Sequence, residues 1–268
     1  MISNNFEIIS PKNLNEDDLV LLSTGQGFLE TLKYTRNTLW FKELHYSRLQ
    51  NSAKLFNIDI CPLRLNNAVK EKIILNGKNH SYRIRIILLF SFIGKHKSTG
   101  KIIIQLLPFN VITGHNKNYS LTLQISPSSN NPLAKYKTIN FGPAFFKKQE
   151  AVNSGFNDVL FYNAKNKLLE ASISNIFGVR GGKLYTPPLS DSILPGTIRQ
   201  LLIENMNVME KEILVSEIES FDYFFLTNSI VEIQPVKKID AIQFKIEENR
   251  FSEIMLSWER IKNKYLGK

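Results

Sequence analysis

Apolar residues recur along the chain in short runs with two different periods, which predicts a mixed fold of strands and helices. Runs rich in β-branched and aromatic residues, bounded by polar or glycine-containing turns, are typical of strands. In the first half, strands are expected at residues 18–22, 28–35, 82–92 and 101–107. Turns are expected at residues 25–27 and around Gly94 and Gly100. Residues 41–56 place Phe41, Leu49 and Phe56 on one side of a helix.

The second half is richer in expected strands. They lie at residues 121–125, 159–162, 176–179, 183–186 and 221–227, with helices at 145–154, 196–205 and 251–265. Residues 111–119 contain few groups to bury and are the expected interdomain linker. The sequence therefore predicts an α/β (α+β) fold with two domains. The smaller N-terminal domain spans residues 1–110, and the larger, strand-rich C-terminal domain spans residues 120–268.

The composition indicates a globular protein rather than a membrane or secreted one. The chain has 268 residues, 43% hydrophobic and 22% charged, which is enough to bury the core of one large or two modest domains. No apolar run approaches the ~20 residues of a membrane helix, and the first residues lack the basic and apolar segments of a signal peptide. The single cysteine, Cys61, has no internal partner for a disulfide. These features favour a cytoplasmic protein without membrane partners.

The formal net charge of +10 favours anionic ligands, such as a small anionic substrate or a phosphorylated cofactor. The lysines are scattered, and the sequence lacks the arginine-rich tract or interleaved aromatic platform of a nucleic-acid surface. Nucleic acid is therefore not an expected partner. The histidines show no metal-ligand spacing, so no metal site is predicted.

Five short motifs carry the candidate chemistry. They are His45-x-x-Arg48-Leu49, Lys137-x-x-Asn140, Glu170-x-Ser172-x-Ser174-Asn175, Gly196-Thr197-Ile198-Arg199 and Thr227-Asn228-Ser229-Ile230. In this order and spacing they resemble the class IV aminotransferases, the fold-type IV enzymes that use pyridoxal 5'-phosphate (PLP). That family includes branched-chain aminotransferases, D-amino acid aminotransferases and aminodeoxychorismate lyases. The resemblance implies the two-domain fold, PLP held between the domains, and a homodimer.

PLP chemistry needs a lysine amine that forms a Schiff base with the cofactor aldehyde. Two lysines compete for this role, Lys135 and Lys137, and on a strand both would face the same side. The family places its lysine three or four residues before an asparagine. Lys137 lies three residues before Asn140 and Lys135 lies five, so the resemblance assigns the Schiff base and the later proton transfer to Lys137.

The resemblance also assigns the other cofactor contacts. Glu170 matches the family's glutamate beside the pyridine nitrogen, where a carboxylate raises the pKa of that nitrogen and keeps the ring electron-poor. The phosphate is expected at the start of a helix, because its backbone N–H groups bind anions and glycine lets them approach. The cofactor-binding residues implied are Arg48, Lys137, Glu170, Ser174, Asn175, Gly196, Thr197, Ile198, Asn228 and Ser229.

The substrate side departs from the family pattern. Most members carry Tyr-Gly-Asp-Gly-x-Phe-Glu-Thr, whereas this chain has Thr24-Gly25-Gln26-Gly27-Phe28-Leu29-Glu30-Thr31, and Phe141 replaces a tyrosine that many branched-chain enzymes carry. The residues expected on the substrate side are Gln26, Phe28, Glu30 and Phe141.

Three features favour a lyase that releases 4-aminobenzoate and pyruvate from aminodeoxychorismate, a step of folate synthesis. They are the compact chain, the Lys-x-x-Asn spacing and the stretch at 227–230. In addition, residues 86–92 contain no arginine for a substrate carboxylate. A branched-chain or D-amino acid aminotransferase is the alternative. A binding module without catalysis is a third reading, and the retention of Lys137, Glu170 and Arg48 together argues against it.

Overall fold

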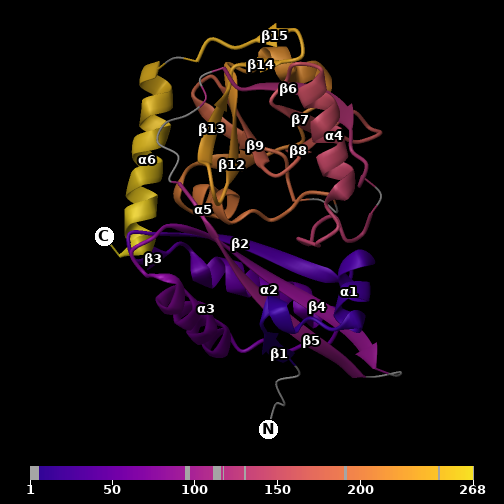
Figure 1. Ribbon diagram of the computed structural model, residues 1–268. Coiled ribbons are helices and arrows are strands. Elements are labelled where there is room, and N and C mark those ends of the chain that lie inside the picture. Colours follow the sequence, from indigo (N-terminus) through magenta and orange to yellow (C-terminus); the bar gives the residue numbers. More distant parts are fainter. Residues whose placement is uncertain are drawn as a thin grey trace. The chain divides into compact units, whose positions relative to one another are not determined.

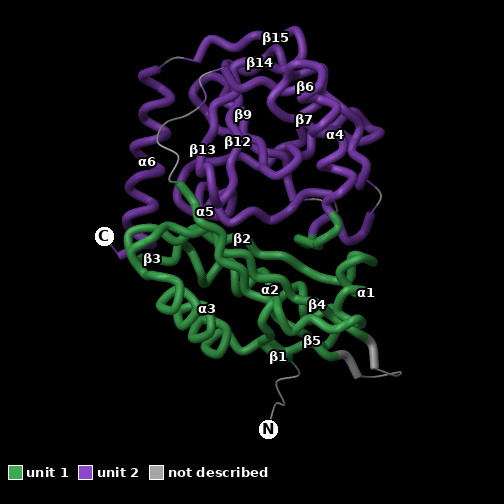
Figure 2. Tube along the Cα trace, in the orientation of Figure 1, with its two compact units in different colours: residues 1–111, 136–140 green, residues 112–135, 141–268 purple. Residues whose placement is uncertain are grey.

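The computed structural model describes residues 6–93, 97–110, 116, 118–129, 131–189, 192–246 and 248–267 (Figure 1). Its contacts divide the chain into two units, residues 1–111 with 136–140 and residues 112–135 with 141–268 (Figure 2). The short segment that contains Lys137 therefore groups with the first unit, although sequence analysis placed it in the C-terminal domain. Most of the expected linker, at 111–115 and 117, lies outside the described residues.

The first unit is built on a five-stranded sheet with the order β1-β5-β4-β2-β3. Its strands are β1 (Phe6–Ile9), β2 (Gly27–Thr35), β3 (Thr38–Leu39), β4 (Tyr82–Ile93) and β5 (Lys97–Pro108). Strands β1 and β5 are parallel, and the other neighbours are antiparallel. The strands predicted at 28–35, 82–92 and 101–107 are confirmed, but Gly100 lies inside β5 rather than in a turn.

The helices of this unit are α1 (Glu16–Ser23), α2 (Lys42–Lys54) and α3 (Pro62–Asn76), with a short 3₁₀ turn, η1 (Pro11–Asn13). The prediction of a strand at residues 18–22 is wrong, because these residues form α1. A capping box decides the local structure. Asp18 N donates to Asn15 Oδ1 at 2.9 Å, and Asn15 N donates to Asp18 Oδ2 at 3.1 Å. Two N-terminal amides are thereby satisfied, which favours the helix over an extended run.

One face of the sheet forms the core of the first unit, against α2 and α3 (Figure 1). Side chains alternate between the two faces of a strand, and the even-numbered residues of β2 and β4 face this core. The buried cluster includes Phe28, Leu32, Ile84, Ile86 and Leu88 from the strands and Leu49, Leu65 and Val69 from the helices. Residue 30, also even-numbered, lies on the same face, although it is a glutamate.

The second unit contains ten strands among the described residues, and most of them form a path of order β11-β10-β9-β8-β7-β6-β14-β15. They are β6 (Ser120–Ile125), β7 (Asp158–Tyr162), β8 (Leu168–Ala171), β9 (Asn175–Arg180), β10 (Lys183–Thr186), β11 (Val208–Glu210), β12 (Tyr223–Asn228), β13 (Glu232–Val236), β14 (Lys238–Ile239) and β15 (Ile242–Gln243). Strand β12 pairs with both β9 and β13. This pairing brings the ends of β9 and β12 together, at Asn175 and Thr227.

The helices of the second unit are α4 (Gly142–Asn153), α5 (Thr197–Asn205) and α6 (Glu248–Leu266), with a 3₁₀ segment, η2 (Val215–Ser220). Helix α4 starts three residues before its predicted beginning at 145, because Pro143 is accommodated in the first helical turn. Helix α6 buries Trp258 completely, and its indole Nε1 donates to Glu232 Oε2 at 2.8 Å. Among the described residues, no helix is long and apolar enough to span a membrane.

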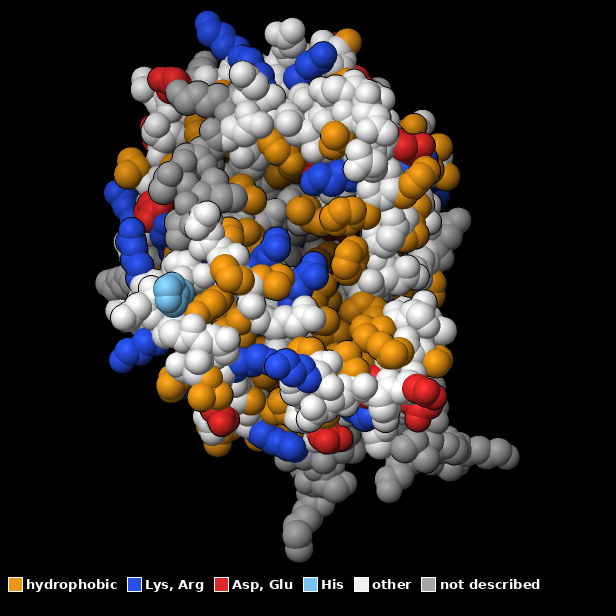
Figure 3. Space-filling model, viewed as in Figure 1, with side chains coloured by type: hydrophobic (Ala, Val, Ile, Leu, Met, Phe, Trp, Pro, Cys, Tyr) orange, Lys and Arg blue, Asp and Glu red, His pale blue; other side chains and the backbone are white. Residues whose placement is uncertain are grey.

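Lysine and arginine side chains are spread over the face shown in Figure 3, separated by polar and apolar residues. Several of these cations have acidic partners, such as Lys148 with Asp158 at 3.2 Å and Lys101 with Asp18 at 2.7 Å. Much of the positive charge is therefore distributed over the surface.

Candidate active site

The backbone around Lys137 is fixed by strand β2. Leu29 N donates to Lys137 O at 2.7 Å, and Ile139 N donates to Gly27 O at 3.0 Å. Thr138 forms an antiparallel bridge with Phe28. Lys135 instead ends a turn in which Ala134 N donates to Asn131 O at 3.0 Å, and it groups with the second unit. The structure thus distinguishes the two lysines that periodicity alone left equivalent, since only position 137 lies on the segment that pairs with β2.

Three charged or titratable side chains meet in the first unit. Glu30 Oε1 accepts from Arg48 Nε and Glu30 Oε2 accepts from Arg48 Nη2, each at 2.7 Å. His45 Nδ1 lies 2.7 Å from Glu30 Oε2. Burial alone would raise the pKa of Glu30, but the Arg48 charge and the hydrogen bonds from Arg48 and His45 outweigh it and lower that pKa to about 2. Glu30 is therefore an ionised carboxylate at neutral pH.

Two residues expected on the substrate side lie in the core of the first unit instead. Phe28 packs in the aromatic cluster with Phe56 and Phe90, at centroid distances of 5.7 and 5.3 Å. Glu30 contacts α2 through Arg48 and His45. The reason is the alternation of β2, which turns both even-numbered side chains towards the helices.

The other two expected substrate-side residues lie near the surface. Gln26 is half-buried and donates from Nε2 to Thr24 Oγ1 at 2.8 Å. Phe141 is the N-cap residue of α4, 36% exposed, and its ring lies 6.0 Å from that of Phe145.

In the second unit, the turn between β8 and β9 places Glu170 opposite Asn175. The turn is closed by Ala171 N, which donates to Ser174 O at 2.8 Å. Glu170 Oε2 accepts from Asn175 Nδ2 at 3.1 Å and from Leu194 N at 3.2 Å. The motif Glu-x-Ser-x-Ser-Asn is thus a tight hairpin whose first and last residues hold each other, and the orientation of the Glu170 carboxylate is fixed.

The same asparagine shapes the start of α5. Asn175 Nδ2 donates to Leu194 O at 2.9 Å, and a Cβ added at Gly196 would lie 2.0 Å from Asn175 Oδ1. Gly196 is the N-cap residue of α5, and among the described residues no side chain caps this helix. Thr197 and Ile198, the first two helical residues, are buried. The first-turn amides are the orphan donors that bind an anion.

Asn228 joins this cluster from the end of β12. Its Nδ2 donates to Ser174 Oγ at 2.9 Å, and its Oδ1 accepts from Ile230 N at 2.9 Å and from Val231 N at 2.8 Å. Ser229 occupies the turn that these bonds close. Within the second unit, the structure therefore brings together Glu170, Ser174, Asn175, Gly196 and Asn228.

Two buried hydroxyl groups in this region were not predicted from the sequence. Ser172 Oγ and Thr227 Oγ1 are buried without a hydrogen-bond partner among the residues that the structure describes. Thr227 pairs with Asn175 across β12 and β9, and Ser172 lies in the β8–β9 turn. Both residues belong to motifs that carry predicted cofactor contacts, Ser172 beside Ser174 and Thr227 beside Asn228. Their place in these motifs is the signal by which the sequence could have identified them.

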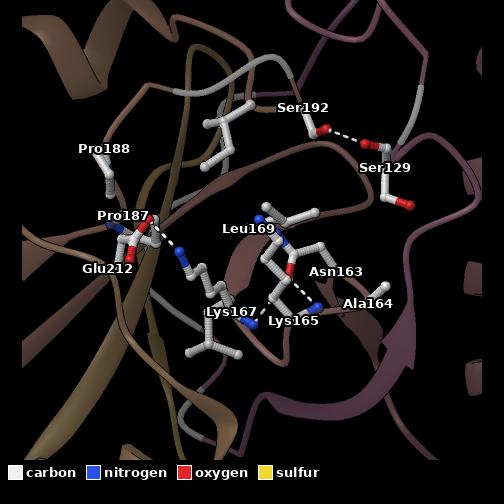
Figure 4. A pocket seen from close by; sticks show the side chains of 12 residues that line it. Ser129, Asn163, Ala164, Lys165, Lys167, Leu169, Pro187, Pro188, Ser192 and Glu212 are labelled. Atoms are coloured by element: carbon white, nitrogen blue, oxygen red, sulfur yellow. Dashed lines mark hydrogen bonds and ion pairs between the residues drawn. The ribbon is translucent and has the colours of Figure 1, made fainter.

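A cavity of about 300 Å³ lies elsewhere in the second unit (Figure 4). Its lining includes Lys167, whose amine lies 2.5 Å from Glu212 Oε1, and Ser192, whose hydroxyl donates to Ser129 O at 2.9 Å. Leu168 and Leu169 of β8 also line the cavity, and Glu170 is not among the residues that line it.

The sequence profile of the family "Amino-transferase class IV" matches residues 27–239. This chain belongs to that family. It is accordingly a PLP-dependent enzyme of class IV, and the predicted fold class and cofactor are confirmed.

Similar proteins include both branches of the family. A Methanocaldococcus jannaschii protein named "Putative branched-chain-amino-acid aminotransferase" is 26% identical over 87% of this chain and 88% of its own. A Legionella pneumophila crystal structure titled "Putative 4-amino-4-deoxychorismate lyase" is 25% identical, with a TM-score of 0.84 over 96% of this chain and 99% of its own. A branched-chain aminotransferase of Thermoproteus uzoniensis with norvaline is 25% identical, with a TM-score of 0.80 over 95% and 92%.

The residues present fit the cofactor. A phosphate needs several donors. The N-terminus of α5 has no side-chain cap among the described residues, and the hydroxyls of Ser172 and Thr227 are buried without a described partner, so both offer donors of this kind. The carboxylate of Glu170, oriented by two donors, suits a protonated pyridine nitrogen. The second unit thus offers a site of matching chemistry for each charged end of PLP.

Proposed function

We propose that this enzyme is a lyase that converts 4-amino-4-deoxychorismate into 4-aminobenzoate and pyruvate. The observation that carries the proposal is the likeness to the Legionella protein, which extends over 96% of this chain and 99% of the other. The Lys137-x-x-Asn140 spacing and the Thr227-Asn228-Ser229-Ile230 stretch support it.

When bound, PLP supplies an electron sink that acidifies the substrate carbon next to the nitrogen. Lys137 would hold the cofactor through its amine, and the same amine is the base that would accept the acidified proton. The two products together contain all the atoms of the substrate, so this proton must return to one of them. A single amine at position 137 can deliver it to the departing three-carbon group, whose methylene carbon becomes the methyl of pyruvate.

The remaining residues hold the cofactor. Glu170 would face the pyridine nitrogen and keep it protonated, with Asn175 orienting the carboxylate. The phosphate would be held by the amides of Gly196, Thr197 and Ile198. Arg48 would add a charge-assisted contact to the phosphate, as the family resemblance implies, worth roughly 1.5–3 kcal/mol. Ser174, Asn228 and Ser229 would support the same region.

The substrate is expected to be anionic, and the first unit has cations on the sheet face opposite α2 and α3. Lys33 and Arg85 are odd-numbered residues of β2 and β4, and Arg85 lies between Thr31 and Gln105 in register. Lys33 is buried, with its amine 4.4 Å from the Trp40 ring centroid. The positive charge of this face suits an anionic substrate.

An aminotransferase acting on branched-chain amino acids is the second candidate. It is favoured by the names of the curated relatives, such as that of Methanocaldococcus jannaschii. Arg85 also supports an aminotransferase. It lies one residue before the stretch 86–92 that lacks arginine, and its Nε is buried without a hydrogen-bond partner among the described residues. One cation in such a position could take the single α-carboxylate of an amino acid.

Product analysis separates the two reactions. The PLP-loaded protein is incubated with aminodeoxychorismate, and 4-aminobenzoate and pyruvate are measured. In parallel it is incubated with a branched-chain amino acid and 2-oxoglutarate, and glutamate is measured. The proposal expects equal amounts of 4-aminobenzoate and pyruvate, with no glutamate. Glutamate formation without aminobenzoate would instead establish the aminotransferase.

We also propose a homodimer, as the family resemblance implies. Sedimentation of the PLP-loaded enzyme at assay concentrations tests this, and a fully active monomer would contradict it.

A further inference from the structure

Glu30, His45 and Arg48 form a polar cluster inside an otherwise apolar core. The side chains of Glu30 and His45 are each 1% exposed, and that of Arg48 is 12% exposed. Their neighbours on β2 and α2, Phe28 and Leu49, are buried hydrophobic residues. Burying an ion pair costs desolvation energy, and well-packed apolar residues often replace such a pair without loss of stability. The core could therefore be stable with apolar residues at these positions, and stability alone does not require an ion pair there.

The geometry of the pair constrains Arg48. Glu30 engages the Nε and Nη2 groups with its two oxygens, each at 2.7 Å, so it holds one side of the planar guanidinium. Such a bidentate contact fixes both the position and the plane of the group.

His45 completes the arrangement. Because Glu30 is ionised, its Oε2 can only accept, so His45 Nδ1 carries the proton of their 2.7 Å contact. Burial lowers the pKa of His45. The hydrogen bond and charge of Glu30 raise it, but with the positive charges of Arg48 and Lys137 the net shift is downward, which favours the neutral imidazole. Its Nε2 is then a lone pair, buried without a hydrogen-bond partner among the described residues. Glu30 is thereby anchored from two directions, by a cation and by a neutral donor.

We propose that Glu30 and His45 are positioning residues that fix the Arg48 guanidinium for an oxyanion, the phosphate of the cofactor. Neither residue touches the cofactor, and both act through Arg48. The inference rests on the role assigned to Arg48 in the proposed function. It assigns Glu30 to cofactor binding, whereas the sequence predicted a place on the substrate side. It holds equally for a lyase and for an aminotransferase.

Binding to the apo enzyme tests the inference without turnover. The dissociation constants of PLP and of pyridoxal, which lacks the phosphate, are measured by spectroscopic titration. Substitution of a residue that acts through the phosphate changes the dissociation constant of PLP and leaves that of pyridoxal unchanged. Glu30→Gln and Glu30→Asp are each expected to weaken PLP binding about tenfold and pyridoxal binding less than about twofold, as loss of one charge-assisted contact predicts.

Matched variants separate positioning from other roles. Glu43 lies on α2, the helix that carries His45 and Arg48, and its side chain is 76% exposed. Glu43→Gln should therefore change neither the dissociation constant of PLP nor that of pyridoxal. His45→Asn keeps a donor near the Nδ1 position and should retain PLP affinity, whereas His45→Ala should lose several-fold. In an Arg48→Ala background, Glu30→Gln should have no further effect on PLP binding.

Each opposite result overturns the inference. Tighter PLP binding by Glu30→Gln would mean that Glu30 only neutralises Arg48, and equal weakening of PLP and pyridoxal would mean a general structural role. If Arg48→Ala itself spares the preference for PLP over pyridoxal, the assignment of Arg48 fails, and the inference fails with it. If Arg48→Ala removes that preference and Glu30→Gln leaves it intact, the assignment of Arg48 stands and only the inference fails.

Discussion

Replacing Gly196 with alanine tests how closely the start of α5 is built against the β8–β9 hairpin. The new Cβ would lie 2.0 Å from Asn175 Oδ1, far inside van der Waals contact. Asn175 is 5% exposed, and its Nδ2 holds Leu194 O at 2.9 Å and Glu170 Oε2 at 3.1 Å. The methyl group can be accommodated only if the amide moves and both hydrogen bonds break.

The energy of this change follows from the two bonds. A neutral hydrogen bond contributes about 1 kcal/mol, and one to a charged group about 1.5–3 kcal/mol, so Gly196→Ala should destabilise the second unit by roughly 2–4 kcal/mol. Backbone strain adds nothing, because Gly196 has φ −70° and ψ 142°, a region that alanine adopts freely. The cost therefore reports the contact with Asn175 alone.

Urea unfolding of the apo protein measures this cost. It is followed by tryptophan fluorescence in a Trp40→Phe background, so that the signal comes from Trp258 in the second unit. Gly142→Ala is the matched control, because a Cβ at Gly142 would meet no described atom within 4 Å. It should shift the free energy of unfolding by less than about 1 kcal/mol.

A double-mutant cycle with Asn175→Ala identifies the contact. Once the Asn175 amide is removed, the nearest described atom to the new methyl is Arg199 Cβ at 3.6 Å, an ordinary contact. Gly196→Ala should then cost less than about 0.5 kcal/mol in the Asn175→Ala background. If the full cost persists there, or if Gly196→Ala is as stable as Gly142→Ala, the packing argument is refuted.

Three further predictions concern the first unit, the lysine and α6. Borohydride reduction of the PLP-loaded enzyme should label Lys137, and peptide mapping that finds the label on Lys135 would contradict the assignment. The pKa of Glu30 is about 2 in the folded protein and 4.5 without its environment. The difference contributes about 3 kcal/mol of stability that is fully present above pH 4.5 and is lost as the pH falls towards 2. Glu30→Gln should therefore flatten the acid-unfolding profile between these values, and an unchanged profile would argue against the ion pair. Trp258→Phe removes the donor to Glu232 Oε2 and should cost about 1–3 kcal/mol in urea unfolding. A loss of less than about 0.5 kcal/mol would show that the indole bond contributes little.

Local pattern was sufficient for most elements. The long strands β2 and β4 are rich in β-branched and aromatic residues, and they appear where the pattern places them. Helix α1 was missed because its capping box, a contact between two polar side chains and the backbone, outweighs a short apolar run. Helix α3 was not predicted at all, although Pro62 at its first turn and Gly77 at its end are helix boundary signals.

The sequence by itself determined the family and the cofactor. The chemistry of PLP needs an amine, a carboxylate and an anion site, and each of these lies in a short contiguous motif whose residue types can be read without coordinates. The sequence also determines the hairpin of Glu170 and Asn175 locally, because the two residues that contact each other are only five residues apart.

Only the tertiary structure decided which distant side chains contact one another. Glu30 lies 15 and 18 residues from His45 and Arg48, and Asn175 lies 21 residues from Gly196, so no local period relates them. Whether a strand residue faces substrate or core depends on which face the helices cover, and this choice buried Glu30 against α2. Packing of distant segments sets that face, since alternation along a strand specifies two faces but not which of them meets water.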